Sequence, residues 1–378
     1  MNILQIAKFP PTDRGGIEKL VKQISEEGVK SSNRYDVLCF DERDKSRVDI
    51  LPRYTVFRTR TLFRLFSTPF SIHNLYFMRK IIHNYVIVHV HLPNPLSILY
   101  LMLSLGRQHV SVHFHADASR LKLYVLYRPI EAWILKRANL IIVTNPRTAQ
   151  SSALWPYQQK IKILPLGLSR RDFLHPEIKN ISSTILSISK TRYLISICRF
   201  TAYKNIPMLV DVFSRLNAIY PELRLLVVGS GQEYKQILKA IHRVNLSDCV
   251  TILEDIDDNS KRYLLQHAEA LVLASTTPAE AFGYVQLEAM AMFCPVFSFD
   301  IKKSGVSWVN LSGKTGIVVP IGNNDKEASD NLYISLKIYL SSTSNRSLYA
   351  LNCHEHAKKF QADRLFKELD QALSSFDS

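Results

Sequence analysis

The sequence predicts two α/β domains, each built on a parallel sheet with helices on both faces. A chain of 378 residues is too long for one hydrophobic core and suits two domains of ordinary size. Apolar residues make up 47% of it and charged residues 21%, which is enough apolar material for packed cores and excludes wholesale disorder. Short apolar runs alternate with amphipathic stretches, and this alternation stops near residues 170–190 and then restarts.

In the first half, apolar runs of strand length are separated by stretches with helical periodicity. Pro165 and Gly167 then break the pattern, and a polar stretch rich in Ser and Lys follows. We therefore predict an N-terminal domain over residues 1–172 and a linker over 173–190. The expected strands cover residues 3–7, 35–40, 86–91, 110–115, 140–144 and 160–166, and the expected helices cover 17–30 and 123–137.

The second half repeats the alternation and predicts a C-terminal domain over residues 191–350. Residues 351–378 are expected to form a C-terminal helix that packs back towards the N-terminal domain. Ligands of such sheets bind beyond the carboxyl ends of the strands, so the cleft between the domains is the expected site. The expected strands are 193–198, 223–229, 250–253, 270–273, 295–299 and 315–319, and the expected helices are 207–218, 233–244, 261–268 and 287–292.

The chain ends and the cysteines indicate a cytoplasmic protein. No basic and apolar secretory signal precedes the first expected strand, and the most apolar stretch, 92–105, is interrupted by prolines and is shorter than the roughly 20 residues that span a bilayer. The five cysteines are widely spaced and form no CxxC pair, which fits buried thiols in a reducing compartment and offers no zinc site.

The net charge of +15 is concentrated in one half of the chain. Residues 1–172 hold 26 Lys and Arg against 12 Asp and Glu, whereas residues 173–378 hold 22 against 21. Within residues 52–171, only Asp117 and Glu131 are acidic. This asymmetry indicates that the N-terminal domain meets an acidic partner, such as a membrane surface or a nucleic acid.

Three glycine segments lie where an expected strand leads into a helix. They contain Gly15 and Gly16, Gly229 and Gly231, and Gly283. Free backbone N–H groups at such turns can bind an anion, although tight turns alone would also require glycine. None of the segments matches a complete dinucleotide or P-loop motif, so together they favour a phosphorylated ligand without identifying it.

The segment 278–291 contains two carboxylates, Glu280 and Glu288, on either side of Gly283. Eight helical residues would separate them by about 12 Å. That spacing exceeds the roughly 5–5.5 Å of a retaining glycosidase pair and suits two carboxylates that bind different parts of one long ligand.

This segment, EAFGYVQLEAMA, resembles the signature of the retaining family 4 glycosyltransferases of GT-B fold. Further similarities follow in order over residues 1–320 and are typical of the bacterial branch that builds surface polysaccharides. They are KFPPTDRGGIEKLV, HVHLPNPLS, VHFHADASR, LYRPIEAWILKRANLIIVTNP, KIKILPLG, ISICRFTAYKN, LLVVGSGQE and GVSWVNLSGKTGIVVP.

The resemblance implies a nucleotide-sugar site in the C-terminal domain. Arg199 and Lys204 would hold the diphosphate of the donor, and Glu288 would accept the ribose hydroxyls. Glu280 would contact the sugar, and Phe282 and Gly283 would contribute backbone amides. The other residues assigned to the donor are Gly15, Gly16, Gly229 and Leu287.

The resemblance also implies an active-site histidine, His115, with His113 on the same side as a weaker candidate. Asp117 is expected to orient His115. We see no DxD-type metal motif at a strand end, so the reaction is expected to need no metal or other cofactor. In the family a small residue, often Gly, usually follows EAMA, whereas this chain has Met292 and Phe293 there.

Residues 52–85 combine arginines with large aromatic side chains and contain no acidic residue. Such a composition suits the interface of an anionic membrane, where rings lie at the headgroups and each cation contributes about 1 kcal/mol. It would also suit single-stranded nucleic acid, or a core whose arginines serve solubility. The resemblance favours the membrane, with Arg58, Arg60, Arg64 and Arg120 on the membrane and acceptor side.

The predicted function is transfer of a hexose, mannose or a related sugar, from a nucleotide diphosphate donor, with GDP as the first expectation. The acceptor would be a lipid-diphosphate-linked oligosaccharide in O-antigen or exopolysaccharide synthesis, with the enzyme peripheral on the inner membrane face and with no nucleic-acid partner. The alternatives are a GT-B epimerase, which needs no acceptor, a phosphorylase, which needs free phosphate, and a nucleic-acid-binding protein.

Overall fold

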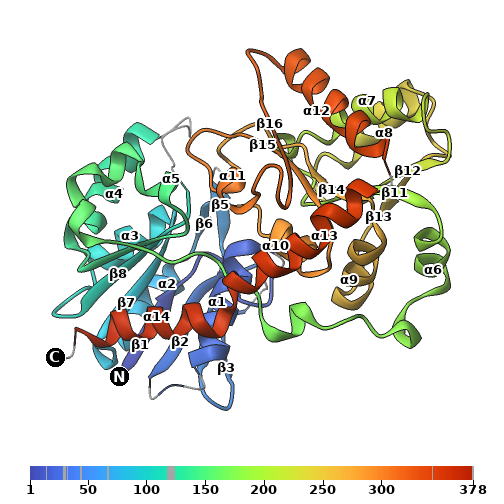
Figure 1. Ribbon diagram of the computed structural model, residues 1–378. Coiled ribbons are helices and arrows are strands. Elements are labelled where there is room, and N and C mark those ends of the chain that lie inside the picture. The colour runs from blue at the N-terminus through green and yellow to red at the C-terminus, as the bar shows by residue number, and fades with distance from the viewer. Residues whose placement is uncertain are drawn as a thin grey trace. The chain divides into compact units, whose positions relative to one another are not determined.

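The computed structural model describes residues 1–13, 15–28, 31, 33–42, 45–65, 68–116, 124–342 and 344–376. The chain forms two compact units (Figure 1). Unit 1 comprises Met1–Gly167 and Ala362–Ser378, and unit 2 comprises Leu168–Gln361. Each unit contains a parallel sheet with helices, so the predicted fold class of two Rossmann-like domains is confirmed.

Unit 1 contains an eight-stranded sheet in the order β10-β9-β8-β7-β1-β2-β4-β3. Every neighbouring pair is parallel except β3 and β4, which are antiparallel. The strands are β1 (Asn2–Ile6), β2 (Arg34–Asp41), β3 (Arg47–Ile50), β4 (Thr55–Arg60), β7 (Ile87–Leu92), β8 (His109–Phe114), β9 (Leu140–Val143) and β10 (Ile161–Ile163). A separate hairpin pairs β5 (Phe63–Leu65) with β6 (Thr68–Phe70).

The two faces of the unit 1 sheet differ in character because side chains alternate along each strand. Val88 and Val90 of β7 and Val112 of β8 lie in an apolar cluster that also contains Met78 of α2 and Ile134 of α4. The intervening positions of β7 and β8 carry histidines, and α1 and α14 lie on that side. The helices are α1 (Gly16–Gly28), α2 (Ile72–Ile81), α3 (Pro95–Met102), α4 (Tyr124–Arg137), α5 (Pro146–Ala149) and α14 (Ala362–Ser374).

Unit 2 contains a fully parallel six-stranded sheet in the order β13-β12-β11-β14-β15-β16. The strands are β11 (Arg192–Ile197), β12 (Leu223–Val228), β13 (Val250–Leu253), β14 (Ala270–Leu273), β15 (Val296–Phe299) and β16 (Gly316–Val319). The helices are α6 (Ser183–Ser189), α7 (Ile206–Asn217), α8 (Tyr234–Arg243), α9 (Asp258–His267), α10 (Val285–Ala291), α11 (Val306–Val309), α12 (Asp325–Leu340) and α13 (Ser344–Ala357).

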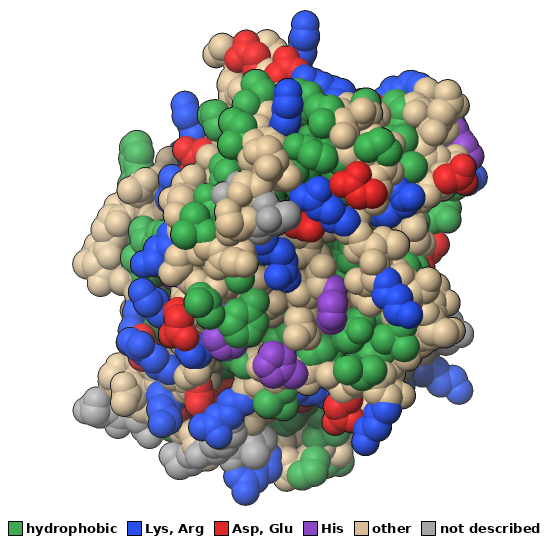
Figure 2. All heavy atoms as spheres, turned by 45° about the vertical axis from the view of Figure 1, so that its right-hand side comes forward, with side chains coloured by type: hydrophobic (Ala, Val, Ile, Leu, Met, Phe, Trp, Pro, Cys, Tyr) green, Lys and Arg blue, Asp and Glu red, His purple; other side chains and the backbone are tan. Residues whose placement is uncertain are grey.

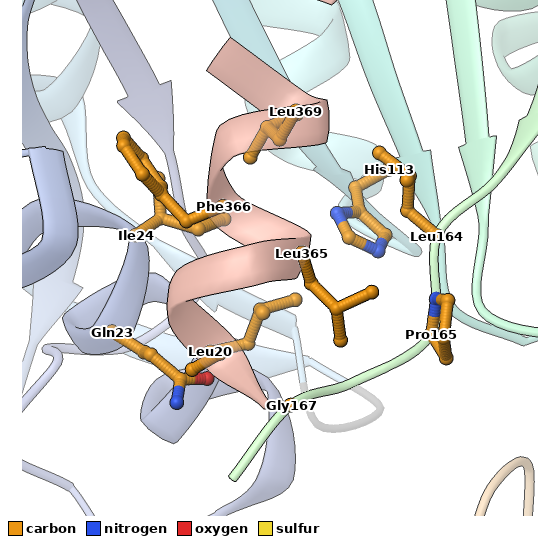
Figure 3. A pocket seen from close by; sticks show the side chains of 11 residues that line it. Leu20, Gln23, Ile24, His113, Leu164, Pro165, Gly167, Leu365, Phe366 and Leu369 are labelled. Carbon is orange, nitrogen blue, oxygen red and sulfur yellow. The ribbon is translucent and has the colours of Figure 1, made fainter. Parts of the chain in front are cut away.

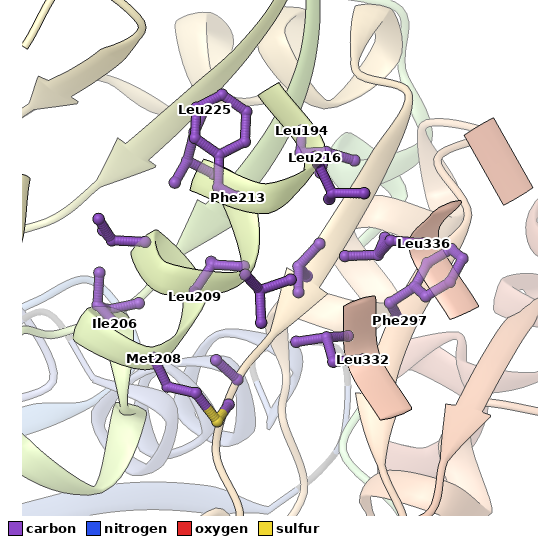
Figure 4. Packing of buried hydrophobic residues seen from close by; sticks show 14 of the residues in the cluster. Leu194, Ile206, Met208, Leu209, Phe213, Leu216, Leu225, Phe297, Leu332 and Leu336 are labelled. Atoms are coloured by element: carbon purple, nitrogen blue, oxygen red, sulfur yellow. The ribbon is translucent and has the colours of Figure 1, made fainter. Parts of the chain in front are cut away.

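The core of unit 2 is formed where α7 and α12 pack together on the sheet (Figure 4). Leu209 and Phe213 of α7 and Leu332 and Leu336 of α12 are completely buried there. Their spacing of three or four residues places them on one face of each helix, as the amphipathic pattern of α7 predicts. This core holds the strands in register and thereby fixes where each strand ends.

The boundaries between the units differ from the expected domain boundaries. Unit 2 begins at Leu168, so residues 173–190 belong to it and contain helix α6 instead of forming a free linker. At the other end, residues 351–361 also belong to unit 2, and α14 alone returns to unit 1. There α14 lies beside α1, and the Tyr35 hydroxyl of β2 donates to Asp370 of α14 at 2.5 Å.

No helix among the described residues is both long and apolar enough to cross a membrane.

Candidate active site

Glu280 and Lys204 form a buried ion pair at the carboxyl edge of the unit 2 sheet. Lys204 ends the 3-10 turn η5 (Ala202–Lys204), which follows β11, and Glu280 lies beyond the end of the neighbouring strand β14. The Ser275 hydroxyl also donates to the Glu280 carboxylate at 2.9 Å. Burial disfavours the charged lysine, but attraction to Glu280 outweighs it and raises the pKa of Lys204.

Glu288 forms a second lysine pair on helix α10. Its carboxylate lies 3.0 Å from Nζ of Lys261 on α9, and both side chains are largely buried. Lys261 also contacts Asp258 at 2.9 Å. Each of the two carboxylates in the EAFGYVQLEAMA segment therefore faces a lysine from a different element.

The segment between the two glutamates turns sharply into α10. Gly283 has a φ of +68°, a conformation that side chains other than glycine rarely adopt. Phe282 is buried, and its carbonyl accepts a hydrogen bond from the Gln286 side chain at 2.9 Å. Leu287 is completely buried, so its side chain packs in the core and any contact with a ligand would have to come from its backbone.

Arg199 and Gly229 lie at the same edge of the sheet as Lys204 and Glu280. Arg199 follows β11 and is exposed, and Gly229 follows β12, which pairs with β11. A Cβ atom on Gly229 would lie 1.8 Å from the Cys198 carbonyl oxygen. The close approach of two strand ends is therefore sufficient to require this glycine.

Two acidic side chains, Asp257 and Asp258, lie at the start of helix α9. Asp257 is the N-cap of α9, and its carboxylate accepts hydrogen bonds from the backbone N–H groups of Asn259 and Ser260, each at 2.8 Å. The hydrogen bond from Ser260 is the main cause of the lowered pKa of Asp257. Its neighbour Asp258 pairs with Lys261, the lysine that also contacts Glu288.

In unit 1, His115 directly follows β8 and belongs to a buried cluster of imidazoles. Its ring stacks on that of His113 with centroids 4.3 Å apart, so the two side chains share one side of the sheet as expected. Its Nε2 lies 3.0 Å from Nδ1 of His91 on β7. Burial lowers the pKa of His115 to about 3, so its ring is neutral at physiological pH.

The glycine loop of unit 1 lies between β1 and α1. Gly16 is the first residue of α1, and a Cβ atom added to it would meet no atom of the described residues within 4 Å. The backbone N–H of Lys19 donates to the Gly15 carbonyl at 2.9 Å. Asp117, which we expected to orient His115, and Arg120 lie outside the described residues.

The prediction that Arg58 faces a membrane is wrong. Its side chain is only 4% exposed, because it lies between Asp41 and Asp49 and also donates to the Thr12 hydroxyl. Arg60 and Arg64 are exposed, and Arg64 pairs with Glu42. Arginine in a short strand can point to either side, and its acidic partners are 9 and 17 residues away, so the sequence did not reveal this burial.

Three of the histidines, His89, His91 and His113, have ring nitrogens within 4.8 Å of one another, which is close to the spacing of metal ligands. The rings of His91 and His113 are stacked at an interplanar angle of 16°. Since an imidazole binds a metal in its ring plane, these two nearly parallel rings do not aim at one point. The ring of His89 lies edge-on to both of them, with interplanar angles of 84° and 82°.

Comparison with known proteins identifies the two units. A model of the domain described as Glycosyltransferase Family 4 matches residues 14–170, and one described as Glycosyl transferases group 1 matches residues 178–339. The chain belongs to the GT-B glycosyltransferases. The predicted resemblance to family 4 glycosyltransferases is thereby confirmed, and the predicted enzyme is confirmed as a glycosyltransferase.

Individual relatives of this glycosyltransferase include a mannosyltransferase and a rhamnosyltransferase. It is 27% identical to the O-antigen chain mannosyltransferase C of Escherichia coli over 331 residues, which are 87% of this chain and 86% of the relative. It is 26% identical to the D-rhamnosyltransferase WbpZ of Pseudomonas aeruginosa over 310 residues, 81% and 79% of the two chains. Sucrose-phosphate synthase of Thermosynechococcus elongatus has the same fold, with a TM-score of 0.80, 19% identity and coverage of 99% and 98%.

Several polar residues at these sites were not predicted from the sequence. Lys261, Ser275 and Ser304 surround the two glutamates, with Ser304 donating to the Glu280 carbonyl. Gln5 and His91 contact the histidine cluster of unit 1. The sequence does carry a signal for His91, since HVHLPNPLS and VHFHADASR repeat histidine at every second position of two expected strands.

Proposed function

We propose that the enzyme transfers a hexose, mannose or a related sugar, from a GDP-linked donor to a lipid-diphosphate-linked oligosaccharide of O-antigen or exopolysaccharide synthesis. The observation that carries this proposal is the pair of lysine–carboxylate contacts at one sheet edge of unit 2. They offer cations for a diphosphate and carboxylates for hydroxyl groups within one segment. The relatives named as an O-antigen chain mannosyltransferase and as a D-rhamnosyltransferase support the sugar class.

Each polar group has a role in this proposal. Lys204 and exposed Arg199 neutralise the diphosphate, and no metal ion is assigned to that task. Glu288, held by Lys261, accepts the ribose hydroxyls, and Glu280 accepts hydroxyl groups of the sugar. In this proposal Lys204 contacts both the Glu280 carboxylate, which binds the sugar, and the diphosphate, which is the leaving group. It therefore links the binding of the two parts of the donor.

We propose transfer with retention of the anomeric configuration. The bond from the anomeric carbon to the phosphate oxygen breaks, and the acceptor hydroxyl oxygen bonds to that carbon on the same face. The hydroxyl proton passes to the leaving diphosphate, so atoms and charges balance without a redox partner. Glu280 is assigned to sugar binding and not to nucleophilic attack, because its carboxylate is already engaged by Lys204 and Ser275.

The test is a panel of nucleotide sugars offered with a lipid-linked acceptor and analysed by mass spectrometry. The proposal expects one added hexose on the acceptor, with GDP-mannose or a related GDP-sugar most effective. A product formed from the donor without acceptor would indicate an epimerase instead. A strict requirement for free phosphate would indicate a phosphorylase.

We also propose that unit 1 binds an anionic membrane peripherally, on the cytoplasmic side, through the exposed part of residues 60–80. Phe63 of β5 stacks on Phe70 of β6, and Ile72 and Tyr76 follow one helical turn apart on α2. Lys80 lies over the Tyr76 ring at 5.9 Å. The exposed apolar residues are Leu62, Phe63, Ile72 and Tyr76, and the exposed basic residues beside them in the sequence are Arg60, Arg64, Arg79 and Lys80.

On the face drawn in Figure 2, Lys and Arg lie among apolar and acidic side chains. That face therefore carries no continuous basic track of the kind that would bind a nucleic acid, which favours a local site that combines rings with cations.

Sedimentation with vesicles tests the membrane proposal. The double variant Ile72→Ser, Tyr76→Ser should bind vesicles containing 30% anionic lipid at least tenfold more weakly than the wild-type chain, because it loses the apolar contacts. The variant Ile334→Ser, Ile338→Ser, with two exposed apolar residues of α12 in unit 2, is the matched control. Equal binding by all three proteins, or salt-sensitive binding to nucleic acid but not to vesicles, would overturn it.

A further inference from the structure

Four histidines lie on one face of the unit 1 sheet. His89 and His91 alternate with buried valines along β7, His113 occupies the corresponding position on β8, and His115 follows directly. His91 and His113 are paired in register across the two strands. All four side chains are buried, although only His115 was assigned a role in the reaction.

A chain of hydrogen bonds connects His115 to the backbone of β2. His115 Nε2 lies 3.0 Å from His91 Nδ1, and His91 Nε2 lies 3.2 Å from Gln5 Oε1. Gln5 Nε2 then contacts the Ser25 hydroxyl of α1 at 2.8 Å, and that hydroxyl contacts the Tyr35 carbonyl at 3.2 Å.

Backbone carbonyls fix the direction of every bond in this chain, because a carbonyl oxygen can only accept. The Ser25 hydroxyl must donate to the Tyr35 carbonyl. The Gln5 amide nitrogen must face Ser25 and the Val21 carbonyl, which it contacts at 3.4 Å, so its oxygen faces His91. His91 Nε2 must then carry the proton that Gln5 Oε1 accepts.

Burial lowers the pKa of His91 well below its ordinary value, so this ring carries a single proton. With that proton on Nε2, Nδ1 is an acceptor, and His115 Nε2 must donate to it. The neutral His115 ring has its own proton on Nε2 and a lone pair on Nδ1. Among the described residues, Nδ1 of His115 has no hydrogen-bond partner.

We infer that Gln5 and His91 are positioning residues that hold His115 in the Nε2–H tautomer and leave its Nδ1 as an acceptor for a sugar hydroxyl. The tautomer follows from the hydrogen bonds alone, and the sugar hydroxyl as partner rests on the proposed function. All donors in the chain point the same way, from His115 to Tyr35, and bonds aligned in this manner strengthen one another.

This assignment disagrees with the role expected for Asp117. A carboxylate that orients a neutral histidine needs a proton on the nitrogen it faces. If Asp117 faced Nδ1 of His115, that ring would need the opposite tautomer, in which Nε2 could no longer donate to His91. The two interpretations therefore predict opposite proton positions on one ring.

His113 differs from the other members of the cluster. Neither of its ring nitrogens has a hydrogen-bond partner, and the ring lines a mainly apolar cavity formed by residues of α1, α14 and the segment 164–167 (Figure 3). It stacks on His115 from one side and so limits the rotation of that ring. We therefore assign it a packing role. The hydrogen bonds of His91 with Gln5 and His115 determine which nitrogen of His115 carries the proton.

The direct test is NMR of protein labelled with 13C and 15N in histidine, with the His115 signals assigned from His115→Gln. Ring 15N and 13Cδ2 shifts distinguish the two tautomers of a neutral imidazole. The inference expects the Nε2–H pattern for both His91 and His115 at pH 7.5. A proton on Nδ1 of His115 would overturn it, and this result would not depend on whether any transfer activity is found.

Variants of His91 test the consequence for activity. His91→Asn retains an amide oxygen that can accept from His115 Nε2, whereas His91→Phe retains only the ring shape. We expect His91→Phe to lose the tautomer signal and to lower kcat about 10- to 100-fold with donor KM within twofold, and His91→Asn to restore most of both.

His89→Phe is the matched control, because it places the same ring on the same strand without touching the hydrogen-bond chain. It should keep the tautomer signal and most of kcat. Equal loss of kcat in His89→Phe and His91→Phe with an unchanged tautomer would overturn the positioning role. A wild-type chain with the expected tautomer but no transfer would instead contradict the proposed function alone.

Discussion

Lys204 and Glu280 show how a single buried pair can serve binding and stability together. Both side chains are close to fully buried, and loss of one partner leaves an uncompensated charge. Neither residue is unusual in the sequence, since each stands in a loop after a strand. The pairing arises because β11 and β14 are neighbours in the sheet although 76 residues separate the two side chains.

A double substitution separates the contribution of this pair to stability from its contribution to donor binding. Lys204→Met should lower the free energy of unfolding by about 3–5 kcal/mol, because Glu280 stays buried without its cation. Lys204→Met combined with Glu280→Gln should recover most of that loss, as no charge remains, yet should stay inactive in transfer. Urea unfolding measures the free energy of unfolding, and the mass-spectrometric assay measures transfer. Recovery of transfer together with stability would show that the pair is purely structural.

A substitution of Gly16 separates donor binding from stability, because no atom of the described residues would contact an added methyl group. Gly16→Ala should leave the free energy of unfolding unchanged or raise it by up to about 1 kcal/mol, since alanine favours a helix. If the donor phosphate passes close to this backbone, the added methyl group should raise donor KM at least tenfold. Gly106→Ala, also in unit 1, is the control. An unchanged donor KM would remove Gly16 from the donor site.

At the scale of elements, β7 and β8 show what the sequence can and cannot reveal. Their apolar positions predict buried strands, and alternation correctly places His113 and His115 on one side. The hydrogen bonds between His91, Gln5 and Ser25 depend on α1 lying against that side, which no local pattern contains. The strands β3 to β6 were not predicted either. Three of them, β3, β5 and β6, have only three or four residues, which carry too little periodicity.

The segment after α10 departs from the family pattern. The sequence shows this departure but not how the structure accommodates it. Phe293 replaces the small residue that the family resemblance leads one to expect, and its φ is +58°. The ring stacks face to face on His354 of α13, with centroids 4.1 Å apart. A residue that strains the backbone here thus gains a packing partner from a helix 60 residues further along the chain.

The buried histidines predict that unit 1 is sensitive to acid. Burial lowers the pKa of His89 to about 4 and that of His115 to about 3, whereas an unfolded histidine titrates near 6.5. Between these values the unfolded chain binds protons that the folded chain does not. The free energy of unfolding should therefore fall by up to about 1.4 kcal/mol per pH unit for each such histidine as the pH drops below 6.5.

Urea unfolding followed by tryptophan fluorescence between pH 7.5 and 5 measures this dependence. His89→Gln should reduce the slope, because glutamine does not titrate and the wild-type histidine has an unpartnered Nε2 in that position. A free energy of unfolding that stays constant from pH 7.5 to 5 would contradict the burial of neutral imidazoles.

At the scale of the whole molecule, the two units carry different charges and are assigned different tasks. The alternation of strands and helices was enough to predict both sheets, because fully buried parallel strands are continuous apolar runs. The exact boundaries were not predictable, since polar residues 173–190 pack as part of unit 2 and α14 crosses back to unit 1. The burial of Arg58 likewise removes one basic residue from the surface proposed to meet the membrane.

We propose that Glu280 and His115 each contact the sugar that is transferred. The most direct measurement is the initial rate of hexose transfer to a lipid-linked acceptor by Glu280→Gln and His115→Ala, each confirmed to be folded by circular dichroism. We predict that each variant loses at least about 100-fold in kcat/KM, since Glu280→Gln removes the negative charge and His115→Ala the imidazole that the proposal assigns to the reacting sugar. Transfer at a near-normal rate by both variants would contradict the assignment of this site.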